Sequence, residues 1–244
     1  FKRDTHYGST WVDAAGPYTA TAVGAVSGNA FSGGYYETGF KVADLRKAGG
    51  YTVAAWTKFT GSIGQTYAAI VGGRDPAGGT EWFIGKNAGN SCVGVQDGNY
   101  NPNTACGSSL FDGNYHSFVF TENSAGAGVV YVDGVKVGGG SWSGGAHVDQ
   151  EYVTIGKEHE GSGYPWKGQI DEVAFYTKAL SAAEAATVST KLASGTRLCG
   201  EGTVKFGNKF VQIGSWRFGD VDGVHFSMAY KGGKTAQIYR SDGT

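Results

Sequence analysis

Apolar and polar side chains alternate with a period of two residues along many short stretches of this chain. Residues 51–59 are the clearest case, and residues 67–71 and 81–85 alternate in the same way. Because neighbouring side chains of a β-strand point to opposite faces, this period gives each stretch one face for a core and one for solvent. Stretches spaced this regularly predict a sandwich of antiparallel sheets rather than a parallel α/β sheet.

Glycine separates these stretches. The 244 residues include 43 Gly and only 4 Pro, so glycine far exceeds its usual share of about 7%. Without a collagen-like period, this much glycine indicates many turns and bulges between short strands. The strongest turn is Asp133-Gly134, which predicts a hairpin between residues 128–133 and 135–137. Further β-rich runs lie at residues 116–121, 152–156 and 169–176.

One helix stands out near the end of this alternating region. Ser181 and Glu184 form a capping box, in which the Ser hydroxyl accepts from the Glu amide and the Glu carboxylate reaches back. The helix is expected to end near Ser194, and beyond it the chain has shorter strand-like runs with glycine turns. We therefore predict an all-β sandwich over residues 1–194 with one short helix near its end, and a small β-rich extension over residues 195–244.

Three cysteines constrain the loops. Cys92 and Cys106 flank residues 96–103, a cluster of turn-forming residues that predicts a hairpin. A hairpin brings the two sulfurs within reach of a disulfide, which stabilises the fold by about 3 kcal/mol for a loop of this size. The alternative is a pair of buried free thiols. Cys199 is left over, either buried and free or available to cross-link a second chain.

Charge and hydropathy exclude some partners. Lys and Arg total 20 against 21 for Asp and Glu, which gives a net charge of -1. Nucleic acids need a basic field to release their counterions, so we expect no nucleic-acid partner. No run of about 18 apolar residues occurs, so we expect no membrane span. A chain low in charge and rich in Ser, Thr, Tyr and Gly suits the extracellular space, and the start at Phe1 leads us to expect a secreted protein numbered after processing.

Four blocks of sequence appear in a fixed order. The chain carries YTVAAWTK at 51–58, DGNYH at 112–116, VYVDG at 130–134 and GQIDEVAFY at 168–176, the last followed by ALSAAE at 179–184. These blocks resemble a strand, a turn, a hairpin and the closing strand with its helix in laminin-G-like domains, the concanavalin A-like jelly rolls. The resemblance spans residues 11–191 and implies a jelly-roll sandwich of two antiparallel sheets. Tyr115 stands where the family usually has Trp, and residues 13–16 match the family's opening only loosely.

The same resemblance implies a structural Ca²⁺ ion where the first loop meets the final core strand. The position that matches the family's acidic residue is Asp171, with Asp13 as its partner from the first loop. A carboxylate in a run that also holds Ile170 and Val173 is out of place in a packed sheet unless it is paired or binds a metal. The alternative is a hydrogen bond between Asp171 and a loop backbone.

Sugar binding needs exposed aromatic faces for stacking and a few amide or carboxylate groups for the hydroxyls. Trp142 and Trp166 lie in glycine-rich stretches with little local core around them, whereas Trp56 is expected in the core. The alternative for Trp142 and Trp166 is that they cover the ends of the sandwich. The candidate ligand-binding residues are Trp82, Tyr100, Trp142, Tyr164 and Trp166.

The sequence offers little for catalysis. A glycosidase needs two carboxylates that flank the scissile bond, about 5 to 10 Å apart. The nearest strings, at residues 158–160 and 171–172, lack the E-x-D-x-E pattern of the hydrolases that share this sandwich, and no G-x-S-x-G elbow occurs. We therefore expect a protein that is not an enzyme and has no catalytic residues.

Together these observations predict a secreted, non-catalytic recognition module that binds a glycan or adheres to a matrix or cell-surface component. The alternative is a structural subunit of an extracellular assembly or filament, which self-associates through the strands after Gly195 or through Cys199. A polysaccharide-active hydrolase or lyase ranks third.

Overall fold

The structure is a computed structural model of the chain. It describes residues 10–12, 19–27, 29–46, 49–62, 64–74, 81–87, 92–97, 103–106, 109–141, 151–158, 163–195, 204–206, 209–211, 226–230 and 236–240. The chain divides into two compact units, one of Phe1–Asp13 with Tyr18–Leu198 and the other of Ala14–Pro17 with Cys199–Thr244.

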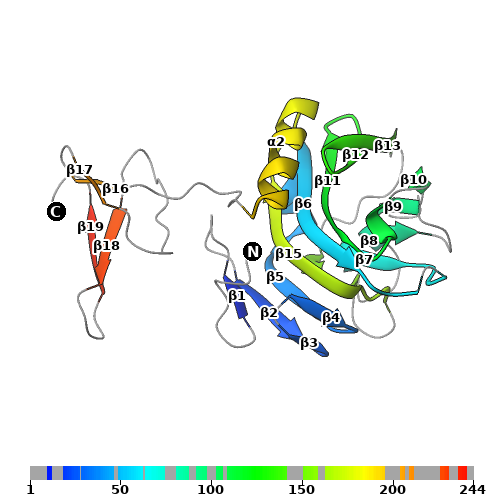
Figure 1. The fold of residues 1–244 in the computed structure, drawn as a ribbon, viewed down its shortest axis with the longest axis horizontal. Coiled ribbons are helices and arrows are strands. Elements are labelled where there is room, and N and C mark those ends of the chain that lie inside the picture. Colours follow the sequence, from blue (N-terminus) through cyan, green and yellow to red (C-terminus); the bar gives the residue numbers. More distant parts are fainter. Residues whose placement is uncertain are drawn as a thin grey trace. The chain divides into compact units, whose positions relative to one another are not determined.

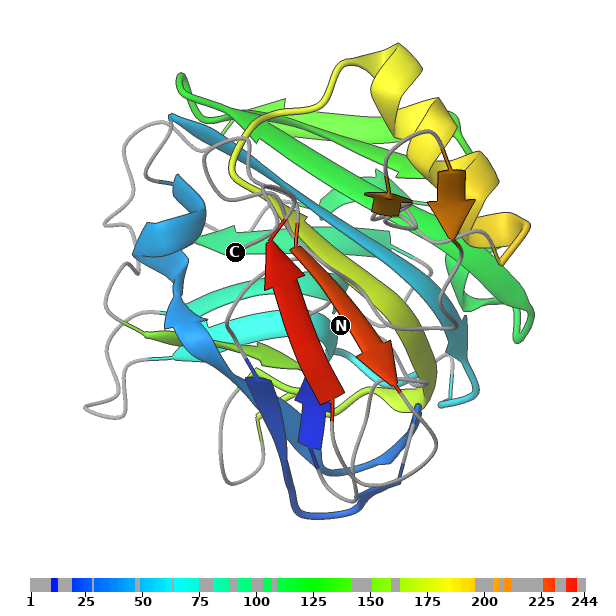
Figure 2. The ribbon, with the colours of Figure 1, turned by 90° about the vertical axis from the view of Figure 1, so that its left-hand side faces the viewer.

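The larger unit is a sandwich of two antiparallel sheets (Figure 1, Figure 2), which confirms the predicted all-β jelly-roll class. The first sheet has eight strands in the order β1 (Thr10–Val12), β2 (Thr19–Val23), β5 (Tyr35–Lys41), β14 (Tyr152–Ile155), β7 (Ala68–Arg74), β8 (Glu81–Asn87), β9 (Cys92–Asp97) and β10 (Asn103–Cys106). The second sheet has seven strands in the order β13 (Val135–Ser141), β12 (Ala127–Val132), β11 (Tyr115–Asn123), β6 (Gly50–Phe59), β15 (Lys167–Tyr176), β4 (Ala30–Ser32) and β3 (Val26–Ser27).

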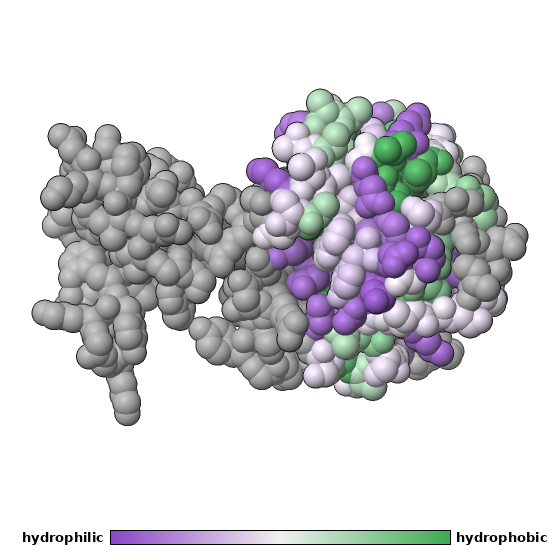
Figure 3. Space-filling model, in the orientation of Figure 1, coloured by the Kyte–Doolittle hydropathy of each residue, from purple (hydrophilic) through white to green (hydrophobic). Residues whose placement is uncertain are grey.

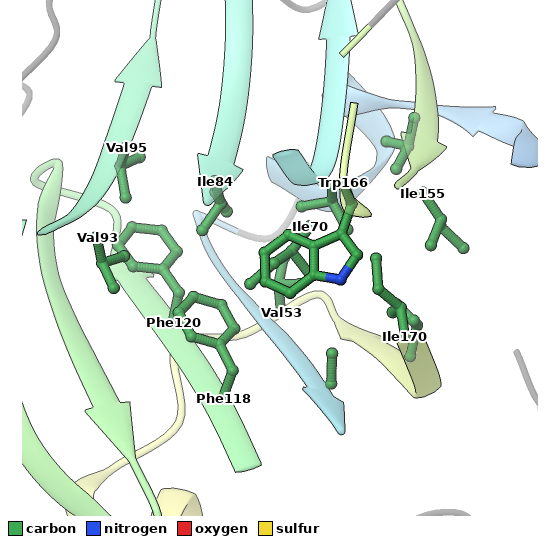
Figure 4. Packing of buried hydrophobic residues seen from close by; sticks show 14 of the residues in the cluster. Val53, Ile70, Ile84, Val93, Val95, Phe118, Phe120, Ile155, Trp166 and Ile170 are labelled. Carbon is green, nitrogen blue, oxygen red and sulfur yellow. The ribbon is translucent and has the colours of Figure 1, made fainter. Parts of the chain in front are cut away.

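The alternation in the sequence becomes the two faces of each sheet. On β6, Val53, Ala55 and Phe59 enter the core between the sheets, whereas Trp56 and Lys58 point to the other face and stay half-buried. Valine, isoleucine and aromatic side chains from both sheets meet in this core (Figure 4). Removing this apolar surface from water is the main force that holds the two layers together.

Helix α2 (Ala182–Ala193) begins and ends where the sequence predicts. Ser181 Oγ accepts from Glu184 N at 3.3 Å, and Ser181 N donates to Glu184 Oε2 at 2.8 Å, so the predicted capping box is confirmed. The hydrogen bond from Lys178 and those from Ser181 lower the pKa of Glu184 to about 2. The helix packs on β6, β11 and β12 from outside the sandwich, through Ala185, Val188 and Leu192. The described residues also form the short helical turns α1 (Val42–Arg46) and η2 (Ser109–Phe111).

A disulfide joins Cys92 of β9 to Cys106 of β10. The two residues face each other across the antiparallel pair, as the hairpin prediction requires. The predicted bridge is therefore confirmed, and it closes the edge hairpin of the eight-stranded sheet.

The smaller unit contains two pairs of antiparallel strands. Strand β16 (Val204–Phe206) pairs with β17 (Lys209–Val211), and β18 (Phe226–Tyr230) pairs with β19 (Ala236–Arg240). The predicted boundary after residue 194 stays a prediction, and Cys199 lies outside the described residues. Within the described part of the chain, no helix has the length and hydropathy to cross a membrane.

Candidate functional site

Two of the predicted ligand contacts lie in the core. Trp82 and Trp166 are both 0% exposed. The Trp166 ring meets Phe59 edge to face with centroids 5.1 Å apart, and its Nε1 donates to Lys58 O at 3.3 Å. Figure 4 shows the indole between the sheets, among core aliphatic residues such as Ile70. A ring without exposed surface cannot stack on a sugar, so the predicted ligand contact is wrong for both tryptophans.

Tyr164 lies half-buried beside the outer face of the eight-stranded sheet. Its ring lies 4.4 Å from that of Tyr67 and 5.5 Å from that of Phe83, measured between centroids. Phe83 alternates with core residues Trp82 and Ile84, so it points away from the core. The other predicted site residues, Tyr100, Trp142 and Asp13, lie outside the described residues, and their roles stay predictions.

The outer face of the seven-stranded sheet carries a different aromatic pair. Strand register places Lys58 of β6 between Tyr115 of β11 and Gln169 of β15. One step along the same face, Trp56 lies beside Asp171 of β15. We call these five residues (Trp56, Lys58, Tyr115, Gln169 and Asp171) the outer platform.

The platform combines apolar rings with polar groups at short range. The Trp56 and Tyr115 rings lie nearly parallel, with centroids 5.6 Å apart and planes inclined by 7°. Lys58 Nζ lies 5.6 Å from the centroid of the Tyr115 ring, and Tyr115 Oη donates to Gln169 Oε1 at 2.6 Å. Tyr115 is 36% exposed, and the other four residues are half-buried. Two rings, an ammonium, an amide and a carboxylate therefore share one accessible sheet face.

Asp171 forms the edge of the platform next to β4. Its Oδ2 accepts from Asn29 Nδ2 at 3.3 Å, and its Oδ1 accepts from Glu172 N at 3.0 Å. The β6–β15 register shifts between Asp171 and Ala174, and Glu172 has a φ of 51° within this bulge. No group of three or more His, Cys, Asp or Glu side chains that could hold a metal occurs among the described residues. The Ca²⁺ site, which also needs Asp13, stays a prediction.

A histidine holds the turn that carries Tyr115. His116 Nδ1 lies 2.7 Å from Asp133 Oδ2, and His116 Nε2 lies 3.0 Å from Asp112 Oδ1. Burial alone lowers the pKa of His116, but the hydrogen bonds with Asp133 and Asp112 outweigh burial and raise it. The bond from His116 in turn lowers the pKa of Asp112 to about 2. Asp133 Oδ1 also accepts from Ser117 N at 2.9 Å, so the network ties two turns to the start of β11.

Trp56 lies on the outer face rather than in the core predicted for it. The signal that identifies its face is present in the sequence, because Trp56 and Lys58 are two residues apart and share one side of β6. A lysine on a strand favours the face that reaches solvent, although Lys86 of β8 is itself buried. Tyr115, which stands where the family usually has Trp, begins β11 opposite Lys58 and stacks its ring on Trp56.

One family matches most of the chain. It is described as the concanavalin A-like lectin/glucanases superfamily, and it matches residues 10–186. No curated protein matches the chain in sequence.

Several solved structures are similar in fold. A mutant of Trypanosoma rangeli sialidase with trans-sialidase activity has a TM-score of 0.57 at 18% identity, over 76% of this chain and 31% of that chain. The same sialidase with 2,3-difluorosialic acid has a TM-score of 0.56 at 16% identity, over 78% and 32% of the two chains. The CBM40 of the Ruminococcus gnavus IT-sialidase has a TM-score of 0.49 at 11% identity, over 63% and 92%. The likeness to the Trypanosoma sialidase shows the fold alone, and the chain spans about a third of the length of that sialidase, at 31% and 32%.

Proposed function

The chain belongs to the concanavalin A-like lectin/glucanase superfamily, and from this premise we propose that its sandwich is a non-catalytic module that binds glycan through the outer platform. The observation that carries the proposal is the parallel pair of Trp56 and Tyr115 rings on a half-exposed sheet face. Lys58, Gln169 and Asp171 lie directly around this pair.

The platform has the chemistry that a sugar needs. The C–H face of a pyranose ring packs on an aromatic ring, while its hydroxyls exchange hydrogen bonds with amide, carboxylate and ammonium groups. Gln169 already accepts from Tyr115 Oη, which leaves its amide nitrogen to donate to a hydroxyl. Tyr115 is fixed through this bond and through Trp56, so little side-chain freedom is lost when a ligand binds.

The platform also supports a binding role over a catalytic one. Hydrolysis of a glycosidic bond by the usual route takes two carboxylates on either side of the bond. Of the five platform residues only Asp171 carries a carboxylate, and both of its oxygens accept hydrogen bonds from protein donors. The fold is shared with a sialidase, and at 18% identity this likeness shows the fold alone.

We further propose an extracellular location and a structural Ca²⁺ ion. The Cys92–Cys106 disulfide supports the location, since such bonds persist in oxidising compartments. For the ion, Asp171 is the carboxylate that the described residues supply, and Asp13 with loop carbonyls would have to complete the six to eight oxygens that Ca²⁺ usually takes. Calcium titration of chelated protein should give heat and raise the melting temperature, and both should be lost in Asp171→Asn.

The test of the glycan site is a pair of alanine variants with a matched control. Trp56→Ala and Tyr115→Ala should each weaken binding on a glycan array and in solution by about tenfold or more, which equals about 1.4 kcal/mol. Tyr152→Ala removes another tyrosine, 50% exposed and on the eight-stranded sheet, and should leave binding unchanged. Thermal melts of all three variants exclude unfolding as the cause. Wild-type affinity in Trp56→Ala and Tyr115→Ala together would show that the platform is not the binding site.

A second candidate function is that of a subunit in an extracellular assembly. Strand β13 ends the order of the seven-stranded sheet, and Val135 on it is 65% exposed. Figure 3 shows an apolar patch where Figure 1 draws β12 and β13. An exposed edge strand is a template for pairing with another chain. Light scattering of the pure protein separates the two functions. A defined oligomer that becomes monomeric in Val135→Lys favours assembly. A monomer that binds glycan favours the recognition module.

A further inference from the structure

A groove lies between helix α2 and the end of β15. It has a volume of about 360 Å³. Helix α2 packs mainly on β6, β11 and β12, and the groove lies on the side of the helix that faces the end of β15. The groove is lined by Tyr176, Lys178, Leu180, Ala183, Glu184, Thr187, Val188 and Lys191.

The groove and the platform lie on one continuous strip of the sheet. Gln169 and Asp171 of the platform precede Ala174 and Tyr176 on β15, and Trp56 packs with Ala174 and Tyr176 against the same apolar cluster under α2. From Gln169 to Tyr176 the strand is seven steps long. That is about 20 Å along a bulged strand, more than a single sugar ring covers. The strip therefore suits an extended chain of sugars rather than one terminal sugar.

Along this strip, lysines without an ion pair outnumber carboxylates without one in the part of the chain that the structure describes. Glu184 accepts from Lys178 Nζ at 2.6 Å and from Ser181 N at 2.8 Å, so its negative charge is paired within the protein. Asp171 accepts only from two neutral donors, Asn29 Nδ2 and Glu172 N, so it keeps its negative charge. Lys58 of the platform and Lys191 of the groove form no ion pair among the described residues. Lys167, on the same face of β15 as Gln169, is exposed and likewise has no ion pair there.

We infer that the ligand is an extended polysaccharide with carboxylate or sulfate groups, which runs from the outer platform into the groove beside α2. This inference rests on the proposed function and adds the chain length and charge of the ligand to it. The rings of Trp56 and Tyr115 receive sugar faces, while Lys58, Lys167 and Lys191 receive anionic groups along the chain. Exposed ion pairs are weak singly and are screened by salt, so the affinity depends on several of them acting along one chain.

The experiment compares oligomers of increasing length by calorimetric titration. Oligogalacturonates supply carboxylates, their methyl esters are neutral controls of the same length, and carrageenan oligosaccharides supply sulfates. We expect affinity to rise with length, to fall by about tenfold from low to high salt, and to be lost in the methyl esters. Preference for one anionic series over the other identifies the source of the charge.

A matched pair of helix variants tests the groove. Thr187 and Thr190 are both exposed on α2, and each donates its hydroxyl to the carbonyl four residues earlier, but only Thr187 lines the groove. Thr187→Trp should remove the gain in affinity with length, and Thr190→Trp should keep it. Lys191→Gln should lower the salt dependence, whereas Lys136→Gln on β13 should not.

Each outcome separates the inference from the proposed function. If Trp56→Ala abolishes binding while Thr187→Trp leaves the length dependence intact, the platform binds glycan and the groove does not contact the ligand. Equal affinity for a single sugar and a long oligomer, equal affinity for acids and esters, or no binding to either anionic series overturns the inference. Wild-type binding of the long oligomers in both Trp56→Ala and Tyr115→Ala overturns the proposed function itself.

Discussion

Replacing Trp166 by alanine distinguishes a core tryptophan from a ligand contact. Trp166 is 0% exposed, and its ring lies 5.1 Å from Phe59 and 6.5 Å from Phe111, measured between centroids. Loss of a buried tryptophan from a core costs about 3–5 kcal/mol of unfolding free energy, through lost apolar burial and the cavity that remains. The hydrogen bond from Trp166 Nε1 to Lys58 O is lost as well, which adds about 1 kcal/mol.

The expected loss of about 4–6 kcal/mol is a large share of the 5–15 kcal/mol that holds a typical domain together. Urea unfolding followed by circular dichroism gives this difference, if the slope against urea stays constant between variants. Trp166→Phe keeps an aromatic ring in the core and should lose less than half as much. The half-buried Trp56 should lose only about 1–2 kcal/mol on change to alanine, since part of its surface is already in water.

Binding measurements complete this comparison. Trp166→Ala should keep its glycan affinity at temperatures where it is folded, whereas Trp56→Ala should lose affinity while it stays folded. A Trp166→Ala variant that is as stable as the wild type, or that binds no glycan although folded, would refute the reasoning from burial.

Three further perturbations act on single structural features. Cys92 and Cys106 are separated by 14 residues, so reduction or a double change to serine should cost about 3 kcal/mol, seen as a lower melting temperature that dithiothreitol reproduces in the wild type only. The raised pKa of His116 stabilises the folded state below the unfolded pKa of about 6.5, and this stability is lost as the pH rises through the folded value. The unfolding free energy from urea melts should therefore fall as the pH rises through that range, and His116→Gln should lack this pH dependence. The same pH dependence in both proteins would show that the network with Asp133 is not formed. Ser181→Ala removes the N-cap of α2 and should cost about 1 kcal/mol, whereas Ser181→Asp should restore most of it.

The sequence predicts those elements of the fold whose own residues show a clear local pattern. Residues 51–59 carry the clearest period-two signal of the chain, and they form β6, the central strand between β11 and β15. The capping box at Ser181 and the Asp133-Gly134 turn are equally local, and both occur as predicted. Strand β5 (Tyr35–Lys41) was not predicted, although Tyr36, Thr38 and Phe40 alternate with exposed residues. A threonine and a glycine interrupt its apolar pattern, so the strand is defined by pairing with β2 and β14 rather than by its own residues.

The positions of the tryptophans depend on information that no local pattern contains. Trp166 follows a glycine-rich stretch, yet its backbone N donates to Gly156 O at 2.7 Å, and this contact between loops directs the ring into the core. Gly156 has a φ of 89°, and a Cβ there would lie 2.2 Å from the Phe31 ring, so the loop passes where a side chain would not fit. Neither constraint can be read from the residues around Trp166. The face of Trp56, by contrast, follows from its spacing to Lys58.

The site depends on how far helix α2 extends over β6. Thr52 Oγ1 donates to Lys178 O at 2.9 Å and accepts from Leu180 N at 3.0 Å, which fixes the start of the helix at one end of the strand. Next along the same face, Ala54 is small and fully buried in the cluster under α2. Trp56 and Lys58 come next, only partly covered, and there the face opens to solvent. One strand face thus holds the start of the helix at Thr52, contacts the helix at Ala54 and forms part of the outer platform at Trp56 and Lys58. A larger residue at Ala54 would lift the helix and alter the platform beside it, so the size of Ala54 and the exposure of Trp56 are parts of one arrangement.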